Sequence, residues 1–396
     1  MSASVPSEYS LRANLRALPL QVWILFGGTF INRFGTFVMP FLVIYLTRQG
    51  YSVAHSGLAV SGYGAGHLIA SMLGGYLADR IGSRYTIVLS MLVSSAAMVA
   101  LSLARGYAVI LVITLLAGSA AEMYRPAAGA LIGDLVPQEQ HVTAFAVFRL
   151  SLNLGFAAGP ATAGLLADHS FLFLFLGDAV TSLACGMIAL VALPHRLRSH
   201  SQHQRASGAI RHALRNEPFL LFLLATLCVT WIEFQITSTF PLYLQASGYA
   251  AKTYGFLISL NGVLVVLFEL ALTGWTQRLP PQPVIALGYA LFAIGYALIG
   301  LAHSIPVLMM TVAVWTVGEM VFAPVAGAYV TNLAPEQYRG RYQGMWGLTW
   351  SIGMLLGPTL GTLLYQRNES VYWSTVACAG LIGASLALVK RRTVSS

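Results

Sequence analysis

The chain contains 396 residues, of which 57% are hydrophobic and only 9% are charged. A soluble domain carries roughly 25% charged residues, so this composition excludes a soluble globular protein and indicates a surface that mostly faces lipid. The net charge of +9 is scattered over short polar segments, and no clustered basic surface indicates a nucleic-acid partner.

Apolar runs of about 20 residues recur along the chain, and each can cross a hydrocarbon core of roughly 30 Å. We therefore predict an all-α membrane protein. The twelve predicted transmembrane helices cover approximately 21–46, 55–77, 85–104, 107–133, 142–167, 171–193, 219–244, 254–275, 283–302, 305–331, 343–365 and 371–389.

The basic residues predict the side of the membrane that each loop occupies. With both termini in the cytoplasm, fifteen Lys and Arg residues lie on the cytoplasmic side and four on the other. Basic residues concentrate on the cytoplasmic side of membrane proteins. We therefore predict a multi-pass protein of the cell inner membrane whose N- and C-termini are both cytoplasmic.

The chain carries one pattern twice, at an offset of 198 residues, which is half its length. At this offset Pro126 coincides with Pro324, and Gly159-Pro160 with Gly357-Pro358. Each Gly or Pro marks a particular backbone geometry, so aliphatic composition alone does not easily produce such matches. We predict two pseudo-symmetric six-helix bundles, residues 1–193 and 219–396, joined by a basic cytoplasmic linker at 194–218.

Charged residues recur inside the predicted helices, where each is costly to bury. In chain order they are Arg33, Glu122, Arg125, Arg149, Asp178, Glu233, Glu269 and Glu319. Glu122 and Arg125 are three residues apart on one helix face, so they can form a purely structural ion pair. Such a pair does not account for the whole set, which we interpret as a functional site.

Two motifs resemble a known family. The loop after 55–77 reads Gly75-Tyr-Leu-Ala-Asp79-Arg80-Ile-Gly82-Ser-Arg84 and resembles the signature loop of the major facilitator superfamily. In 142–167, Gly155-x3-Gly159-Pro160-x3-Gly164 is similar to the end of the antiporter motif of drug:proton antiporters. The chain is identified as a member of the superfamily, although Ser83 and Val147 depart from the two motifs.

The first motif implies a conformational latch at the inner end of helix 55–77. In the superfamily a carboxylate here, Asp79 in this chain, meets the N-terminus of a helix of the other half. Arg80, Arg84 and Arg341 would supply the basic partners, and Gly75 and Gly82 would permit a tight turn. The alternative is ordinary capping of the loop.

The second motif implies a close contact between helices. Gly155, Gly159 and Gly164 form a smooth stripe, and Pro160 interrupts the backbone hydrogen bonds. In the superfamily this stripe faces the other half and helps to seal the outer side. The alternative is packing of small residues within one half.

In this fold the first, fourth, seventh and tenth helices line a central cavity. Burial in an apolar cavity favours the neutral form of a carboxyl group, as proton coupling requires. We predict Glu122, Glu233 and Glu319 as proton-coupling residues, followed by Glu269 and Asp178, with a structural role as the alternative for Asp178. Arg33, Arg125 and Arg149 are predicted as their charge partners in the cavity.

Aromatic and methionine residues accompany these charges, and such a lining suits hydrophobic or amphipathic solutes. The predicted substrate-binding residues are Asn32, Phe34, Tyr124, Asn153, Trp231, Gln235, Trp315 and Trp350. We predict a proton-coupled exporter of the multidrug type that works by alternating access. The alternatives are a proton-coupled symporter or uniporter of a small metabolite, a lysolipid or lipid flippase, and a receptor on an inactive transporter scaffold.

The predicted partners are a small-molecule substrate, protons and membrane lipid, and we expect a monomer. The sequence shows no nucleophile–base set, phosphate loop or metal-ligand spacing, so we expect no enzymatic activity, cofactor or metal. Cys185, Cys228 and Cys378 lie inside predicted helices, where we expect them to be small buried hydrophobic residues.

Overall fold

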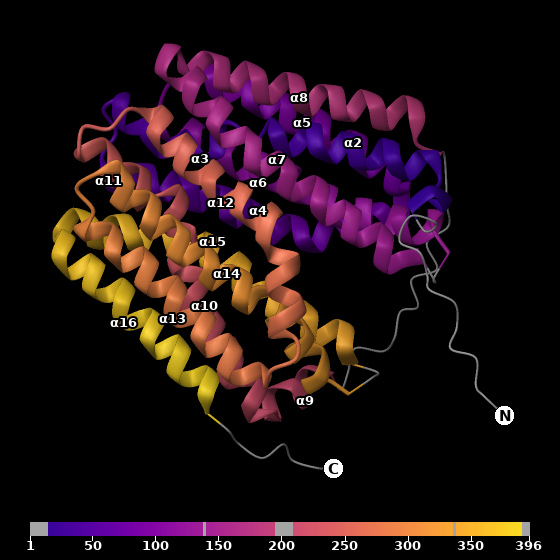
Figure 1. The fold of residues 1–396 in the computed structure, drawn as a ribbon. Coiled ribbons are helices and arrows are strands. Elements are labelled where there is room, and N and C mark those ends of the chain that lie inside the picture. Colours follow the sequence, from indigo (N-terminus) through magenta and orange to yellow (C-terminus); the bar gives the residue numbers. More distant parts are fainter. Residues whose placement is uncertain (1–14, 138–139, 195–208, 336–337, 390–396) are drawn as a thin grey trace.

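The computed structural model describes residues 15–137, 140–194, 209–335 and 338–389 (Figure 1). The side chains of residues 71, 72, 75, 79, 142 and 209 lie outside this description. Every element in the described ranges is helical. The helices are α2 (Leu20–Phe34), α3 (Val38–Arg48), α4 (Val53–Ile81), α5 (Ser83–Leu103), α6 (Tyr107–Leu135), α7 (His141–His169), α8 (Phe171–Ala192), α9 (Ala209–Arg215), α10 (Glu217–Glu233), η2 (Phe234–Thr237), α11 (Thr239–Ala246), α12 (Ala251–Thr276), α13 (Pro281–Ala297), η3 (Leu298–Leu301), α14 (Ile305–Leu333), α15 (Arg339–Arg367) and α16 (Glu369–Leu388).

Eleven helical segments in the described residues are long and apolar enough to cross a membrane. They match eleven of the predicted runs to within a few residues, except that the seventh ends at Thr237 and not near residue 244. The remaining run corresponds to α4, which has 29 residues but is rich in Gly, Ser and His. These residues lower its hydropathy, and the count of twelve membrane crossings stays a prediction.

The long helices run back and forth, so their ends gather at two ends of the molecule (Figure 1). We call these the α9 end and the α11 end. Short polar caps start several helices at both ends. Asn216 accepts a hydrogen bond from the N–H of Phe219 at 3.2 Å, and Asn368 from that of Val371 at 3.0 Å. Such caps satisfy backbone donors that the first helical turn leaves free.

Two of the spans are interrupted, which sequence reasoning did not anticipate. The first breaks between α2 and α3, and the seventh passes through η2 between α10 and α11. Pro40 and Pro241 lie in the first turns of α3 and α11. A proline ring clashes with the carbonyl four residues earlier, at Thr36 and Thr237, and both threonines lie in the interruptions.

The two halves of the chain meet through helices related by the repeat. α4 packs against α15, and α7 packs against α12. At the repeat offset of 198 residues, α4 corresponds to α12 and α7 corresponds to α15. The two contacts are therefore copies of one arrangement. The ribbons of the halves come together near α3 and α11 and spread apart toward α9 (Figure 1).

The cysteines are less uniform than predicted. Cys185 is buried, Cys228 is half-buried and Cys378 is exposed. The expectation of a buried residue is wrong for Cys378, which lies on a face of α16 that α10 and α13 do not cover.

Candidate functional site

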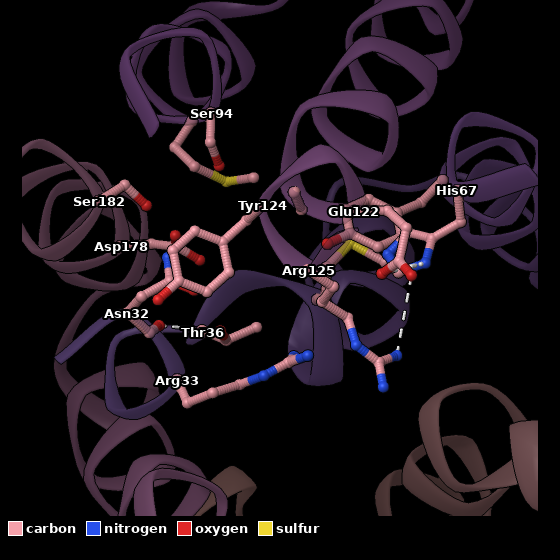
Figure 2. A pocket seen from close by; sticks show the side chains of 14 residues that line it. Asn32, Arg33, Thr36, His67, Ser94, Glu122, Tyr124, Arg125, Asp178 and Ser182 are labelled. Carbon is pink, nitrogen blue, oxygen red and sulfur yellow. Dashed lines mark hydrogen bonds and ion pairs between the residues drawn. The ribbon is translucent and has the colours of Figure 1, made fainter. Parts of the chain in front are cut away.

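Glu122 lies at the middle of α6 with basic groups on two sides (Figure 2). Its Oε2 is 3.2 Å from Nδ1 of His67 on α4, and its Oε1 is 3.7 Å from Nη1 of Arg125. Sequence reasoning foresaw the pair with Arg125 but missed His67. The signal was a histidine near the middle of an apolar span, where a polar side chain needs a partner.

Arg33 extends from α2 toward Arg125, and both line the same hollow (Figure 2). None of the ion pairs between described residues involves Arg33. Asn32 and Tyr124 line this hollow as well, but each has a partner. Asn32 donates to the sulfur of Met91 at 3.3 Å, and the hydroxyl of the buried Tyr124 is bonded to that of Thr29.

Asp178 on α8 has a structural task. Its Oδ2 accepts a hydrogen bond from the backbone N–H of Val38 at 3.3 Å. Val38 is the first residue of α3, where the interruption of the first span leaves backbone donors without helical partners. Asp178 is 5% exposed and holds that break inside the bundle.

The second half contains a different acidic group. Glu319 on α14 accepts a hydrogen bond from Asn261 on α12 at 3.0 Å, and Asn261 also donates to Thr316. Glu233 ends α10 at the interruption of the seventh span, close enough to Glu319 for their charges to repel. No ion pair among the described residues involves either carboxyl group.

Polar atoms without partners accompany Glu233. Its Oε2 and the hydroxyl of Tyr296 are buried, and neither has a hydrogen-bond partner among the described residues. Tyr296, on α13, is within electrostatic range of both Glu233 and Glu319. Buried polar groups are nearly always satisfied, so these unpartnered atoms mark the cluster as a candidate functional site.

Glu269 and Arg149 form an ion pair that joins the two halves. Arg149 on α7 and Glu269 on α12 both lie between the middle of the spans and the α9 end. Arg149 is 56% exposed, whereas Glu269 is 14% exposed. The sequence had named both residues without pairing them, because they are 120 positions apart.

The predicted substrate-binding residues differ in accessibility. Phe34 is half-buried and stacks on Phe30 at 6.2 Å between ring centroids. Asn153, Trp231 and Trp350 are half-buried too. Trp315, in contrast, is 1% exposed and packs against Phe292 and Tyr296, so it belongs to the core of the second half in this conformation.

Gln235 is fully buried at the interruption of the seventh span. Its amide nitrogen donates to the carbonyls of Trp231 at 2.7 Å and Gly357 at 3.1 Å. Its amide oxygen accepts from Ser238 and Thr239. Gln235 therefore satisfies the open backbone between α10 and α11, as Asp178 does for α3, and has no free hydrogen-bonding group in this conformation.

The glycine stripe divides between the two halves. A side chain at Gly155 would meet Cβ of Arg33 at 2.6 Å, and one at Gly159 would meet the carbonyl oxygen of Phe34 at 2.6 Å, both in the same half. Only Gly164 contacts the other half, where a side chain would meet Cα of Lys252 at 2.8 Å. The expectation of a stripe that faces the other half is wrong for its first two members, because α2 occupies that face.

Two hydrogen bonds between the halves are accepted by a pair of serines that sequence reasoning missed. Ser259 on α12 accepts a hydrogen bond from the N–H of Ala161 on α7 at 2.9 Å. Ser61 on α4 accepts one from the N–H of Thr359 on α15 at 3.1 Å. We call these the serine bridges. Both serines and both donors are related by the repeat offset of 198 residues, which was the available signal.

Each serine bridge lies next to a proline within a helix. Ala161 follows Pro160, and Thr359 follows Pro358. A proline opens the backbone hydrogen-bond ladder around it, so the next N–H is available to a partner outside the helix. Gly57 and Gly255 lie beside the same prolines, where a side chain would collide with the proline carbonyl oxygen. The result is two matched seals between the halves, toward the α11 end.

The residues of the predicted latch are described only in part. The surroundings of Gly75 and the side chain of Asp79 lie outside the description. Arg80 donates to the hydroxyl of Tyr76 on its own helix at 3.1 Å, and Arg84 donates to the carbonyl of Leu190 on α8. Gly82 has φ of 91° between α4 and α5, a conformation that favours glycine, as the motif implied. Arg341 is exposed near the start of α15.

Two repeated helical halves with charged residues at mid-span define a secondary transporter built from parallel repeats. The chain belongs to the Major Facilitator Superfamily, whose profile matches residues 25–268 and 248–395. It is a multi-pass membrane transporter, and it resembles the drug:proton antiporters of that superfamily.

Curated relatives agree with this assignment. The chain is 26% identical over 374 residues to the uncharacterized MFS-type transporter YqjV of Bacillus subtilis, covering 91% of each chain. It is 26% identical over 380 residues to a Na(+), Li(+), K(+)/H(+) antiporter of Planococcus maritimus, covering 84% of this chain and 87% of the relative. The quinolone resistance protein NorA of Staphylococcus aureus is 22% identical over 377 residues, covering 94% and 97%.

Solved structures show the same fold. A mutant of the peptide transporter POT in complex with sulfate superposes with a TM-score of 0.78, covering 96% of this chain and 97% of that one. The sequence identity is 17%, so this likeness concerns the fold alone.

Proposed function

We propose that this chain is a proton-coupled exporter that exchanges protons for hydrophobic or amphipathic small molecules across the cell inner membrane. In this proposal the α9 end and both termini face the cytoplasm. Residues 1–193 and 219–396 rock against each other around the mid-span residues, joined by the linker at 194–218. Most of that linker, 195–208, lies outside the described residues.

The observation that carries the proposal is the pairing of Glu233 and Glu319. Two like charges in an interior of low dielectric repel each other, and binding of a proton relieves that repulsion. Glu122 has His67 and Arg125 beside it, and Glu269 has Arg149, whereas Glu233 and Glu319 have no described basic partner. We therefore assign proton coupling to Glu233 and Glu319.

The relatives support the direction of transport. The name of NorA reports resistance to quinolones, which for a membrane transporter implies export. The Planococcus relative exchanges monovalent cations for protons, as its name states. Export of organic molecules and exchange of Na⁺, Li⁺ or K⁺ are thus two candidate activities. The half-buried aromatic side chains of Phe34, Trp231 and Trp350, which we predict to bind substrate, favour the first, because small hydrated cations need oxygen ligands instead.

The serine bridges support alternating access. They close the α11 end, while the ribbons of the halves separate toward the α9 end. In the proposed orientation this is a state closed to the outside and open to the cytoplasm. Transport requires a second state in which the serine bridges are broken.

Everted membrane vesicles with a preset pH gradient test the proposal. Lipophilic cations, neutral amphiphiles, Na⁺, Li⁺ and K⁺ are added in turn while a fluorescent dye reports the gradient. We expect lipophilic cations to collapse the gradient with the wild type, and Glu233→Gln and Glu319→Gln to abolish this response. Glu369→Gln, at an exposed helix start near the α11 end, is the matched control and should respond like the wild type.

Other outcomes would replace the proposal. A response to Na⁺, Li⁺ or K⁺ alone would identify a cation antiporter. If no compound moves protons although the purified protein binds a solute, then symport, uniport or lipid flipping becomes the activity to pursue.

A further inference from the structure

The basic mid-span residues Arg33, Arg125 and Arg149 all belong to the first half, whereas the acidic ones belong to both halves. Glu233, Glu269 and Glu319 lie in the second half, and Glu122 and Asp178 in the first. Arg149 and Glu269 neutralise each other across the interface. The mid-span wall of the first half then keeps Arg33 and Arg125 against Glu122 and Asp178, and Asp178 accepts the N–H of Val38. The mid-span wall of the second half keeps the carboxyl groups of Glu233 and Glu319.

Arg33 is the cationic group with no described acidic partner. Its guanidinium lies beside that of Arg125 in the hollow of the first half (Figure 2). Gly155 on α7 lies against Cβ of Arg33 on α2, so these two helices approach more closely than a larger residue at position 155 would permit. Two guanidinium groups at close range repel each other, so an anion between them is favoured.

Arg125 can contribute to such a site without losing its partner. Its side chain is 53% exposed, whereas that of Glu122 is 16% exposed. Glu122 is contacted at its other oxygen by His67, so one carboxylate is shared between two basic side chains. The free donors of Arg125 and Arg33 therefore face the hollow. Guanidinium groups bind carboxylates through two parallel hydrogen bonds, which gives both affinity and orientation.

The second wall offers the complementary chemistry. Glu233 ends α10, next to Trp231 and Phe234. Trp231 corresponds to Arg33 at the repeat offset of 198 residues, so Glu233 lies at about the same depth in the membrane as Arg33. Glu319 is within electrostatic range of the Arg149–Glu269 pair, which places it beside the interface of the halves. A protonated amine that approaches this wall competes with the proton held there, as exchange requires.

We propose that the substrates are zwitterionic amphiphiles. The acidic group of the substrate binds Arg33 and Arg125, its basic group is directed to Glu233 and Glu319, and its aromatic body lies between the walls. This inference rests on the proposed proton-coupled export and narrows its substrate class. A monocation would leave Arg33 without a counter-charge inside the membrane, so we expect it to be transported more weakly than a zwitterion.

Three probes with one ring system test the inference. They are a quinolone that carries a carboxylate and a basic amine, its carboxyl ester, and its N-acetyl derivative. In everted vesicles we expect the zwitterion to collapse the gradient at about tenfold lower concentration than the ester or the N-acetyl compound, since a charge-assisted hydrogen bond is lost in each. A lipophilic monocation is added in a parallel assay.

Substitutions of Arg33 and Arg125 sharpen the test. Arg33→Gln and Arg125→Gln should weaken the response to the zwitterion about tenfold and leave the ester almost unchanged, because the ester lacks the group that they bind. Arg33→Lys keeps the charge but lacks the planar guanidinium group, so its response to the zwitterion should lie between those of Arg33→Gln and the wild type. Arg105→Gln, exposed near the α11 end, is the control and should match the wild type.

The outcomes separate the two proposals. If the lipophilic monocation moves protons and the ester acts as well as the zwitterion, the proposed function stands and this inference is wrong. It is also wrong if Arg33→Gln weakens both probes equally. If no compound moves protons, the proposed function fails, and equilibrium binding of the three probes to the purified protein decides the inference. Tighter binding of the zwitterion that depends on Arg33 would then support it.

Discussion

The acidic residues inside this transporter differ in what surrounds them, and their surroundings separate their roles. Glu122 is held by His67 and Arg125, and Asp178 by the first N–H of α3. Glu233 meets unpaired polar atoms instead. In the sequence all three are single acidic residues in apolar runs, so only their spatial neighbours distinguish a structural carboxylate from one that is available to a proton.

Asp178 provides a direct test of this distinction. Asparagine keeps an oxygen that can accept from Val38, so Asp178→Asn should retain proton-linked transport. Asp178→Ala removes the cap of α3 and should lower the free energy of unfolding by roughly 1 kcal/mol, measured by thermal unfolding in detergent. Loss of transport in Asp178→Asn without any loss of stability would instead make Asp178 a proton carrier.

At the scale of elements, the serine bridges are the contacts expected to break during transport. Ser61→Ala and Ser259→Ala each leave a backbone N–H without its partner in the closed state, at a cost of about 1–3 kcal/mol. Each should shift the equilibrium roughly tenfold toward opening at the α11 end, and the double variant should shift it further. Ser102→Ala, whose hydroxyl bonds only within its own helix, is the control.

Spin labels at Arg105 and His303, two exposed positions related by the repeat, would report this opening. The three native cysteines are replaced first. We expect the distance distribution between the labels to gain a longer component in the serine variants. An unchanged distribution in the double variant would show that the bridges do not set the equilibrium.

The apolar runs predicted the long helices because hydropathy is a local property of the chain. Pro40 and Pro241 accompany the two interruptions, but Pro126, Pro160, Pro324 and Pro358 lie within continuous helices, so a proline alone does not predict an interruption. The serine bridges, in contrast, depend on which helices meet. Ser61 and Ser259 match at the repeat offset, but their partners lie on α15 and α7, and local sequence does not identify that pairing.

At the scale of the whole molecule, the repeat produces symmetric seals and an asymmetric site. The serine bridges are copies of each other, whereas Arg33 coincides with Trp231, Glu233 with Gly35, and Glu319 with Ala121. The symmetric part suits a movement in which two similar bodies rock. The asymmetric part places Arg33 in one half and Glu233 and Glu319 in the other, so each half presents a different chemistry at mid-span.

The Arg149–Glu269 pair links these bodies across the interface, and exchanging its charges tests that link. Arg149→Glu or Glu269→Arg alone places two like charges together and should impair both stability and transport. The double variant restores opposite charges and should recover most of both. Because Arg149 is more than half exposed, we expect a coupling of only about 1 kcal/mol in a double-mutant cycle on thermal unfolding. Additive losses in the double variant would mean that the two residues act separately and that this pair does not link the halves.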